Sequence, residues 1–135
     1  MKPEKKVDIK VNSDIILARQ AGRDLAMELG FGSADQTRLA TAISELTRNV
    51  RQYAGSGNCV VSDISNNDKT MGVRVVVEDH GGGIQDIEKA MKDGYSTRDG
   101  LGVGLPAAKR LVSKFNIESK KGHTKITIEM VRLLR

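Results

Sequence analysis

Aromatic residues, cysteine and proline are scarce in this chain of 135 residues. It has no tryptophan, two phenylalanines, two tyrosines, two prolines and one cysteine. So few aromatic rings argue against a stacking platform for single-stranded nucleic acid, and a single cysteine, Cys59, cannot form an internal disulfide. No apolar run approaches the roughly 20 residues that a membrane-spanning helix needs. We therefore expect neither nucleic acid nor a membrane among the partners.

The rest of the composition is that of an ordinary globular domain. Hydrophobic residues make up 39% of the chain and charged residues 29%, which predicts one domain over residues 1–135 with its own core. The net charge of +5 is spread along the chain, and it suits an acidic protein surface or a polyphosphate ligand equally well. With one cysteine and no apolar leader, we expect a reducing, cytoplasmic location, and we expect Cys59 to be packed in a strand.

Hydrophobic periodicity predicts a series of strands and helices. Alternating and valine-rich segments indicate strands near residues 7–11, 59–64 and 73–78, and a closing hairpin at 115–119 and 125–131. Helices are expected from Ser13 to Gly30, with Ser13 as the N-cap, and from Ser33 to Gly55, with Ser33 and Gln36 as a capping box. Two further helices are expected at 86–92 and at 105–114. This order predicts an α+β fold, a two-layer α/β sandwich whose mixed, mostly antiparallel sheet carries its helices on one face.

The second predicted helix carries a polar pair beside an apolar stripe. The stripe recurs at the helical period, at Leu39, Ile43, Leu46 and Val50. Glu45 and Asn49 lie four residues apart at its border and project in the same direction. An amide oxygen suits Mg²⁺, which keeps several waters, and a carboxylate can accept a proton from an attacking hydroxyl or water. A solvated helix face with chance spacing is the alternative for this pair taken alone.

Two glycine-rich segments follow. Asp79, Gly81 and Gly83 come at the end of the valine-rich strand, where a carboxylate could accept a hydrogen bond from the adenine amine and glycines allow close approach; a simple acidic turn is the alternative. The second segment opens the helix at 105–114 and exposes backbone amides to a phosphate, at Gly100, Gly102 and Gly104. Residues 94–104 have the length and polarity of a mobile lid.

Several other polar residues are weaker candidates for phosphate or ligand contacts: Ser96, Thr97, Arg98, Lys109, Arg110 and Thr124. No P-loop sequence occurs, and the dinucleotide-like pattern that begins at Gly102 lacks the preceding strand which that motif requires. His80 and His123 are isolated, and no spacing of His, Cys and Asp predicts a zinc site.

Taken together and in this order, the three segments resemble the boxes of a known ATP-binding family. Residues 45–49 match the N box, Asp79-x-Gly81-x-Gly83 the first glycine box, and residues 100–104 the second glycine box. The family includes the ATPase component of DNA gyrase, the ninety-kilodalton heat-shock chaperones, histidine kinases and MutL. The resemblance implies the histidine-kinase-like ATPase (Bergerat) fold with a flexible ATP lid. Within the family the short chain resembles the small anti-sigma-type serine kinases.

Shorter matches narrow the resemblance to the switch kinases of the bacterial stressosome. They lie at residues 18–23, 28–32, 41–46, 53–55 and 93–97, and the similarity runs from about residue 9 to 135, weakest over 56–71. It implies a protein serine/threonine kinase that uses ATP and Mg²⁺ to phosphorylate STAS-domain scaffold proteins of the RsbS and RsbR type in a large stressosome complex. It also implies partner switching in the stress response, with a downstream regulator such as an RsbU-like phosphatase.

The resemblance also implies roles for single residues. Glu45 would be the general base, Asn49 would hold Mg²⁺, and Asp79 would read adenine. Thr124 would contact the nucleotide beside Asp79, and the glycines of the two boxes would shape the pocket and the lid. This chain departs from the family pattern at two places: His80 and Gly82 stand inside the first glycine box, and Gly122-His123-Thr124 replaces the usual Gly-x-Gly-Thr.

Two other functions remain open. The chain could be a non-catalytic, nucleotide-gated anti-sigma or adaptor module, which would not consume ATP in the presence of its partner. It could also be an ATPase with water as acceptor. On the first helix, Ile15, Ile16, Arg19 and Arg23 are candidates for a partner surface, although we expect the two isoleucines to face the core.

Overall fold

A single antiparallel sheet forms one layer of the molecule. The computed structural model describes residues 4–66, 68–81 and 104–134. In this part of the chain five strands pair in the order β1-β2-β3-β5-β4, and each neighbouring pair is antiparallel. The strands are β1 Glu4–Ile9, β2 Gly57–Asp63, β3 Thr70–Asp79, β4 Lys114–Lys120 and β5 His123–Leu133. The valine-rich strand is central and the last two strands form a hairpin, as predicted.

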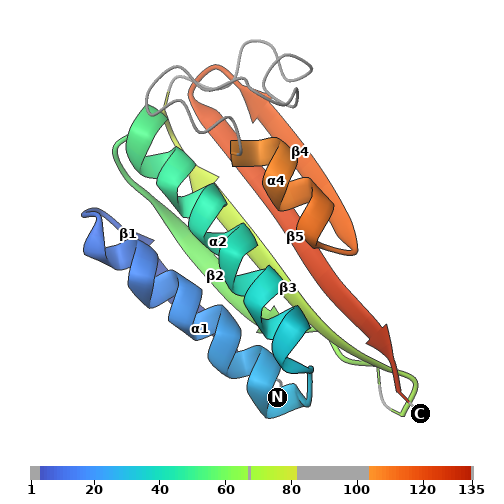
Figure 1. Ribbon diagram of the computed structural model, residues 1–135. Coiled ribbons are helices and arrows are strands. Elements are labelled where there is room, and N and C mark those ends of the chain that lie inside the picture. The colour runs from blue at the N-terminus through green and yellow to red at the C-terminus, as the bar shows by residue number, and fades with distance from the viewer. Residues whose placement is uncertain (1–3, 67, 82–103, 135) are drawn as a thin grey trace.

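The helices form the second layer, on one face of the sheet (Figure 1). They are α1 Ser13–Leu29, α2 Ser33–Tyr53 and α4 Gly104–Leu111. α2 lies between α1 and α4 and packs against both (Figure 1). The predicted two-layer α+β arrangement is therefore confirmed. None of the helices in the described ranges is long and apolar enough to cross a membrane.

The core lies between the two layers and follows the predicted stripe. Leu39, Ile43, Leu46 and Val50 of α2 are all buried, as are alternate residues of β3 at Val73, Val75 and Val77. A β-strand points successive side chains to opposite faces, so only every second residue of β3 faces the helices. Cys59 is buried in β2, as expected, and burial raises the pKa of its thiol to about 12.

The starts of the helices differ from the sequence prediction. Gly32, not Ser33, is the N-cap residue of α2, and no side chain caps this end of the helix. The predicted capping box is therefore wrong, because Gln36 turns its carboxamide back to the Phe31 carbonyl oxygen, 2.8 Å away. Ser13, expected as the N-cap of the first helix, is instead the first residue of α1, and Asn12 occupies the N-cap position.

Two further expectations are corrected. Ile16 is 56% exposed, because the face of α1 that meets the sheet is occupied by Ala18, Ala21 and Leu25. The helix expected over 105–114 ends at Leu111, because the chain enters β4 at Lys114. The helix expected at 86–92 and nearly all of the lid expected at 94–104 lie outside the described residues.

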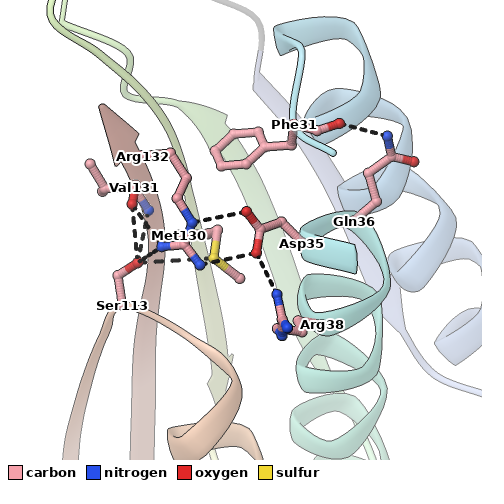
Figure 2. A network of polar contacts seen from close by, with 8 residues as sticks. All are labelled: Phe31, Asp35, Gln36, Arg38, Ser113, Met130, Val131 and Arg132. Atoms are coloured by element: carbon pink, nitrogen blue, oxygen red, sulfur yellow. Dashed lines mark hydrogen bonds and ion pairs between the residues drawn. The ribbon is translucent and has the colours of Figure 1, made fainter. Parts of the chain in front are cut away.

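An ion-pair network ties the N-terminal turn of α2 to the far end of β5 (Figure 2). Arg132 donates from Nε and Nη2 to the two oxygens of Asp35, at 2.9 and 3.0 Å. Arg38 donates to the same carboxylate at 2.9 Å, and Arg132 also reaches the Ser113 hydroxyl at 3.2 Å. These hydrogen bonds, led by the one from Arg132, lower the pKa of Asp35.

Candidate functional site

A row of buried polar side chains crosses the inner face of the sheet at one end. Asp79, the last residue of β3, pairs in register with Thr124 of β5, and Thr124 pairs with Ser119 of β4. Asp79 is 7% exposed and Thr124 is 3% exposed. The hydroxyls of Ser119 and Thr124 lie 2.7 Å apart. Two buried acceptor-bearing groups therefore sit side by side under the helical layer, where an apolar core would otherwise continue.

Two glycines bring the end of α2 close to Asp79. A Cβ on Gly57, which pairs with Asp79, would lie 2.4 Å from the Glu78 carbonyl oxygen and 2.9 Å from Val50 Cγ1. A Cβ on Gly81 would lie 2.6 Å from the Cβ of Ala54. Neither position has room for a side chain. The absence of a side chain at both places lets the last turns of α2 approach the corner where β3 ends.

Gly81 also acts on Asp79 directly. Its backbone N–H donates to Asp79 Oδ1 at 3.0 Å. A carboxylate has two oxygens and about four acceptor sites, so this bond orients the group and leaves capacity for a ligand that donates. The close approach expected at Gly81 is therefore observed, and a role of Asp79 in binding a ligand stays a prediction.

Glu45 and Asn49 lie on α2 at the edge of its buried stripe. Both are half-buried, and their four-residue spacing places them on one side of the helix, about 6 Å apart along its axis. Arg48 donates to Glu45 Oε1 at 2.8 Å, so one oxygen of this carboxylate is already held. Among the described residues, no group of three or more His, Cys, Asp or Glu could hold a metal ion, and an amide such as Asn49 would have to share a metal with a ligand's own oxygens.

The predicted site is described in part. Gly83, Gly100, Gly102 and the residues 96–98 lie outside the described residues. Gly104 is the first residue of α4, and a Cβ there would meet none of the described atoms within 4 Å. Lys109 and Arg110 are exposed near the end of the same helix.

Sequence reasoning missed several residues that build this corner. Ser119 could have been found, because the hairpin turn sets its register with Thr124. Gly57 gives no local signal, since its need for a missing side chain comes from Glu78 and Val50, which are distant in the chain or on another element. His123 Nε2 lies 2.6 Å from Glu78 Oε2 on the outer face of the sheet, and that hydrogen bond is the main cause of the lowered pKa of Glu78.

The residues at this corner fit an adenine nucleotide by their chemistry. The exocyclic amine of adenine is a donor, and a buried carboxylate beside a hydroxyl offers it acceptors in a setting from which water is largely excluded. Asn49 adds a neutral oxygen of the kind that Mg²⁺ accepts alongside phosphate oxygens and waters.

Comparisons with known proteins agree with this fold. Residues 34–133 match the family described as "Histidine kinase-, DNA gyrase B-, and HSP90-like ATPase". The chain is 46% identical over 129 residues to a protein of Bacillus subtilis (strain 168) named serine/threonine-protein kinase RsbT, covering 96% of each chain.

Solved structures share the architecture. One is that of the RsbU and RsbW domains of Rv1364c from Mycobacterium tuberculosis, with a TM-score of 0.66 and 25% identity over 98% of this chain, which spans only 33% of that structure. Another is the mycobacterial sensor histidine kinase MprB, with a TM-score of 0.56, 15% identity, and coverage of 96% and 97% of the two chains. The chain thus belongs to the histidine kinase-, gyrase B- and HSP90-like ATPase family and, within it, to the serine/threonine-protein kinases of the RsbT type.

Proposed function

We propose that this kinase transfers the γ-phosphoryl group of Mg²⁺-bound ATP to a serine or threonine hydroxyl of a STAS-domain protein, and that it works as a partner switch in a stress response. The observation that carries the proposal is the 46% identity, over 96% of both chains, to a protein named as the serine/threonine kinase RsbT. The polar corner around Asp79 supports it, since a nucleotide site is what the family requires.

Asp79 and Thr124 are assigned to the adenine base. Their side chains are buried and adjacent on paired strands, so the carboxylate can accept from the adenine amine while the hydroxyl lies beside it. The bond from Gly81 to Asp79 Oδ1 holds the carboxylate in one orientation, and a carboxylate so oriented needs no reorganisation when the base arrives.

Asn49 and Glu45 are assigned to the phosphate end. Asn49 would offer its side-chain oxygen to Mg²⁺, which neutralises charge on the phosphates when it is bound. Glu45 would accept the proton of the attacking hydroxyl. Arg48 holds one oxygen of Glu45 at 2.8 Å, which fixes the direction of the carboxylate and leaves its second oxygen to act as base. Most of the rate would then come from positioning and charge neutralisation.

The glycines are assigned to the walls of the pocket and to the lid. Gly81 lies against α2 without a side chain, and Gly83 belongs to the same box. At the second box, Gly104 opens α4, and the start of a helix suits phosphate oxygens. Gly100 and Gly102 complete that box in the sequence.

The partners are proposed by analogy with the RsbT-type kinases. STAS-domain proteins of the RsbS and RsbR type would be the phosphate acceptors, and an RsbU-like phosphatase the downstream regulator. A related domain occurs in a solved structure described as the RsbU and RsbW domains of one protein, so a domain of this fold and an RsbU domain occur together in that protein, and this supports the proposal.

The test is a phosphotransfer assay with γ-labelled ATP, Mg²⁺ and a purified RsbS-like STAS-domain protein from the same genome. We expect label on a serine or threonine of that protein. Asn49→Ala and Glu45→Gln should each abolish the label while the circular dichroism spectrum is unchanged. Thr41→Ala, an exposed position on α2, is the matched control and should keep the wild-type rate.

The outcomes separate the alternatives. Normal labelling by Asn49→Ala would remove the metal assignment, and normal labelling by Glu45→Gln would remove the base assignment. ATP-dependent binding of the STAS-domain protein with no label from the wild-type chain would favour the nucleotide-gated adaptor. ATP hydrolysis without a labelled protein would favour an ATPase.

A further inference from the structure

Three titratable side chains meet on the outer face of the sheet, at the end where β3 finishes. His123 Nε2 is 2.6 Å from Glu78 Oε2. The rings of His80 and His123 lie edge to face, with centroids 5.2 Å apart and planes at 60°. We name Glu78, His80 and His123 the histidine cluster. His80 and His123 are 43 positions apart in the sequence, and only the pairing of β3 with β5 brings them together.

The cluster stands directly behind the candidate adenine pocket. Glu78 and His80 are the sequence neighbours of Asp79, and His123 is the neighbour of Thr124. Because side chains alternate along a strand, the cluster points outward from the same pair of strands whose next residues point inward to the pocket. Asp79 and Thr124 are paired on the inner face. On the outer face, the hydrogen bond between His123 and Glu78 therefore joins the residues next to this pair.

The pair of Asp79 and Thr124 is the last rung of the β3–β5 ladder. The pairing runs from Thr70 and Leu133 to Asp79 and Thr124, and β5 itself starts at His123, directly after Gly122 with φ +87 in the turn. Strand ends open more readily than strand interiors. A contact that joins the two strand ends there is placed to keep Asp79 and Thr124 side by side.

The hydrogen bond between His123 and Glu78 belongs to the stronger class of hydrogen bonds. A carboxylate accepting from an imidazole at 2.6 Å is a charge-assisted hydrogen bond when either partner is ionised. Glu78 is held in its ionised form, because the bond from His123 lowers its pKa. Lys125, which faces Glu78 across the ladder, adds a positive charge on the same side and also lowers the pKa of Glu78.

We propose that His123 is a positioning residue for nucleotide recognition: through Glu78 and the edge contact with His80, it holds the last β3–β5 rung closed so that Asp79 and Thr124 receive the adenine base together. The inference rests on the proposed nucleotide function and deepens it. His123 does not touch the nucleotide; it raises the fraction of molecules in which the pocket is already formed, and binding affinity scales with that fraction.

The chain supplies a matched control on the same ladder. Arg74 donates to Glu129 at 2.8 Å, also across β3 and β5 and also on the outer face, but in the interior of the ladder. Loss of either hydrogen bond removes a cross-strand contact from the same two strands. Only loss of the pair at the strand ends should alter the pocket.

The experiment measures ATP and GTP dissociation constants by calorimetry, together with kcat and KM for phosphotransfer, in four chains: wild type, His123→Ala, His123→Gln and Arg74→Ala. We expect His123→Ala to weaken ATP binding about three- to tenfold, which is less than the full contribution of a charge-assisted bond because this bond acts on the pocket only through the strand ends. The preference for ATP over GTP should fall, because guanine presents an acceptor where adenine presents its amine and a loosened Asp79 rejects it less. kcat at saturating ATP should stay within about twofold of wild type, since the change acts on binding.

The remaining variants test the mechanism of this effect. His123→Gln keeps a donor that can reach Glu78 and should restore most of the affinity. Arg74→Ala should leave both dissociation constants unchanged. If His123→Ala does not fold, Glu78→Gln, which keeps the shape and removes the charge, gives the same comparison and should weaken ATP binding in the same direction.

Two results would overturn the inference in different ways. If the wild-type chain binds ATP and the ATP affinity of His123→Ala is unchanged, or falls no more than that of Arg74→Ala, the histidine cluster is only a surface contact and the proposed function still stands. If the wild-type chain binds no ATP, the proposed function falls and this inference falls with it.

Discussion

The contact between Asp35 and Arg132 offers a stability test that is independent of the nucleotide site. Arg132 makes two bonds to the Asp35 carboxylate, at 2.9 and 3.0 Å, and so joins the first turn of α2 to the end of β5 (Figure 2). We would test this contact with a double-mutant cycle of Asp35→Asn and Arg132→Met, which remove the charges and keep most of the side-chain volume.

The coupling energy expected for Asp35 and Arg132 follows from how exposed their side chains are. Two unit charges in contact near a protein surface attract by about 4 kcal/mol at an effective dielectric constant of about 20. The Arg132 side chain is 41% exposed and Asp35 is 16% exposed, so screening and side-chain entropy cancel most of that attraction, as they do in exposed pairs worth about 0.2–1 kcal/mol. Because the pair is bidentate and one partner is largely buried, we expect a coupling energy of about 1–2 kcal/mol. In a chain of this size such a loss lowers Tm by roughly 3–8 °C.

The assay is chemical denaturation of the four chains of the cycle at several pH values. The pKa of Asp35 is lowered in the folded state, so its stabilisation is fully present above the unfolded pKa of about 3.9 and is lost as the pH falls through the folded value. The gap between wild type and Asp35→Asn should thus be constant from about pH 5 to 8 and should close below about pH 4. Arg38→Met is the control, because its bond to Asp35 spans only three residues of one helix and Arg38 is half exposed.

The same cycle separates stability from binding. Asp35 lies 14 residues before Asn49 on α2, which is about 21 Å along the helix. ATP affinity should therefore be unchanged in Asp35→Asn under conditions where it is folded. A coupling energy below about 1 kcal/mol would contradict this prediction, because the pair would then be worth no more than an ordinary exposed one. So would an equal loss of stability in Arg38→Met and Arg132→Met.

Two further predictions follow from packing. Gly57→Ala should lower the free energy of unfolding by roughly 2 kcal/mol or more and weaken ATP binding, because its Cβ would lie 2.4 Å from the Glu78 carbonyl oxygen. Gly32→Ala is the control, because a Cβ there would meet no described atom within 4 Å. Equal denaturation curves for the two variants would contradict the prediction. Cys59 should resist thiol reagents in the native state at pH 8 and react once the chain is unfolded, since it is fully buried and burial raises its pKa to about 12; rapid labelling of the native chain would contradict this.

The parts of the fold that the sequence predicts well are those governed by local periodicity. The stripe of α2 and the valine-rich β3 are both evident in the sequence, because burial on one face imposes a period that a single chain segment shows by itself. The errors lie at helix ends and edges. Ile16 has the side chain of a core residue, yet Ala18 and Ala21 take the inward positions, because close packing of α1 on the layer below favours small side chains there.

In the candidate site, too, the features that depend on local sequence can be predicted, and those that depend on distant segments cannot. Asp79 and Gly81 can be predicted, since they follow a strand that the sequence reveals. The contact of Gly81 with Ala54 cannot, because it depends on how the end of α2 meets the end of β3. Likewise Ser119 follows from the hairpin register, whereas the pairing of β3 with β5 skips β4 and no adjacent turn specifies it.

His80 and His123 come together only through the non-local pairing of β3 with β5, and so the sequence alone does not reveal their contact. Each of them is isolated along the chain, and His123 stands out only as a departure from the family pattern. β3 and β5 pair with Asp79 opposite Thr124, and both side chains face the helices. Because side chains alternate between the two faces of a strand, the residues next to Asp79 and Thr124 must face outward, where they lie close to one another. The inner and outer faces of this one rung are therefore coupled through the backbone, and a substitution on the solvent side acts on the pocket by opening the strand ends. That coupling is the reason to test His123 by base selectivity as well as by stability.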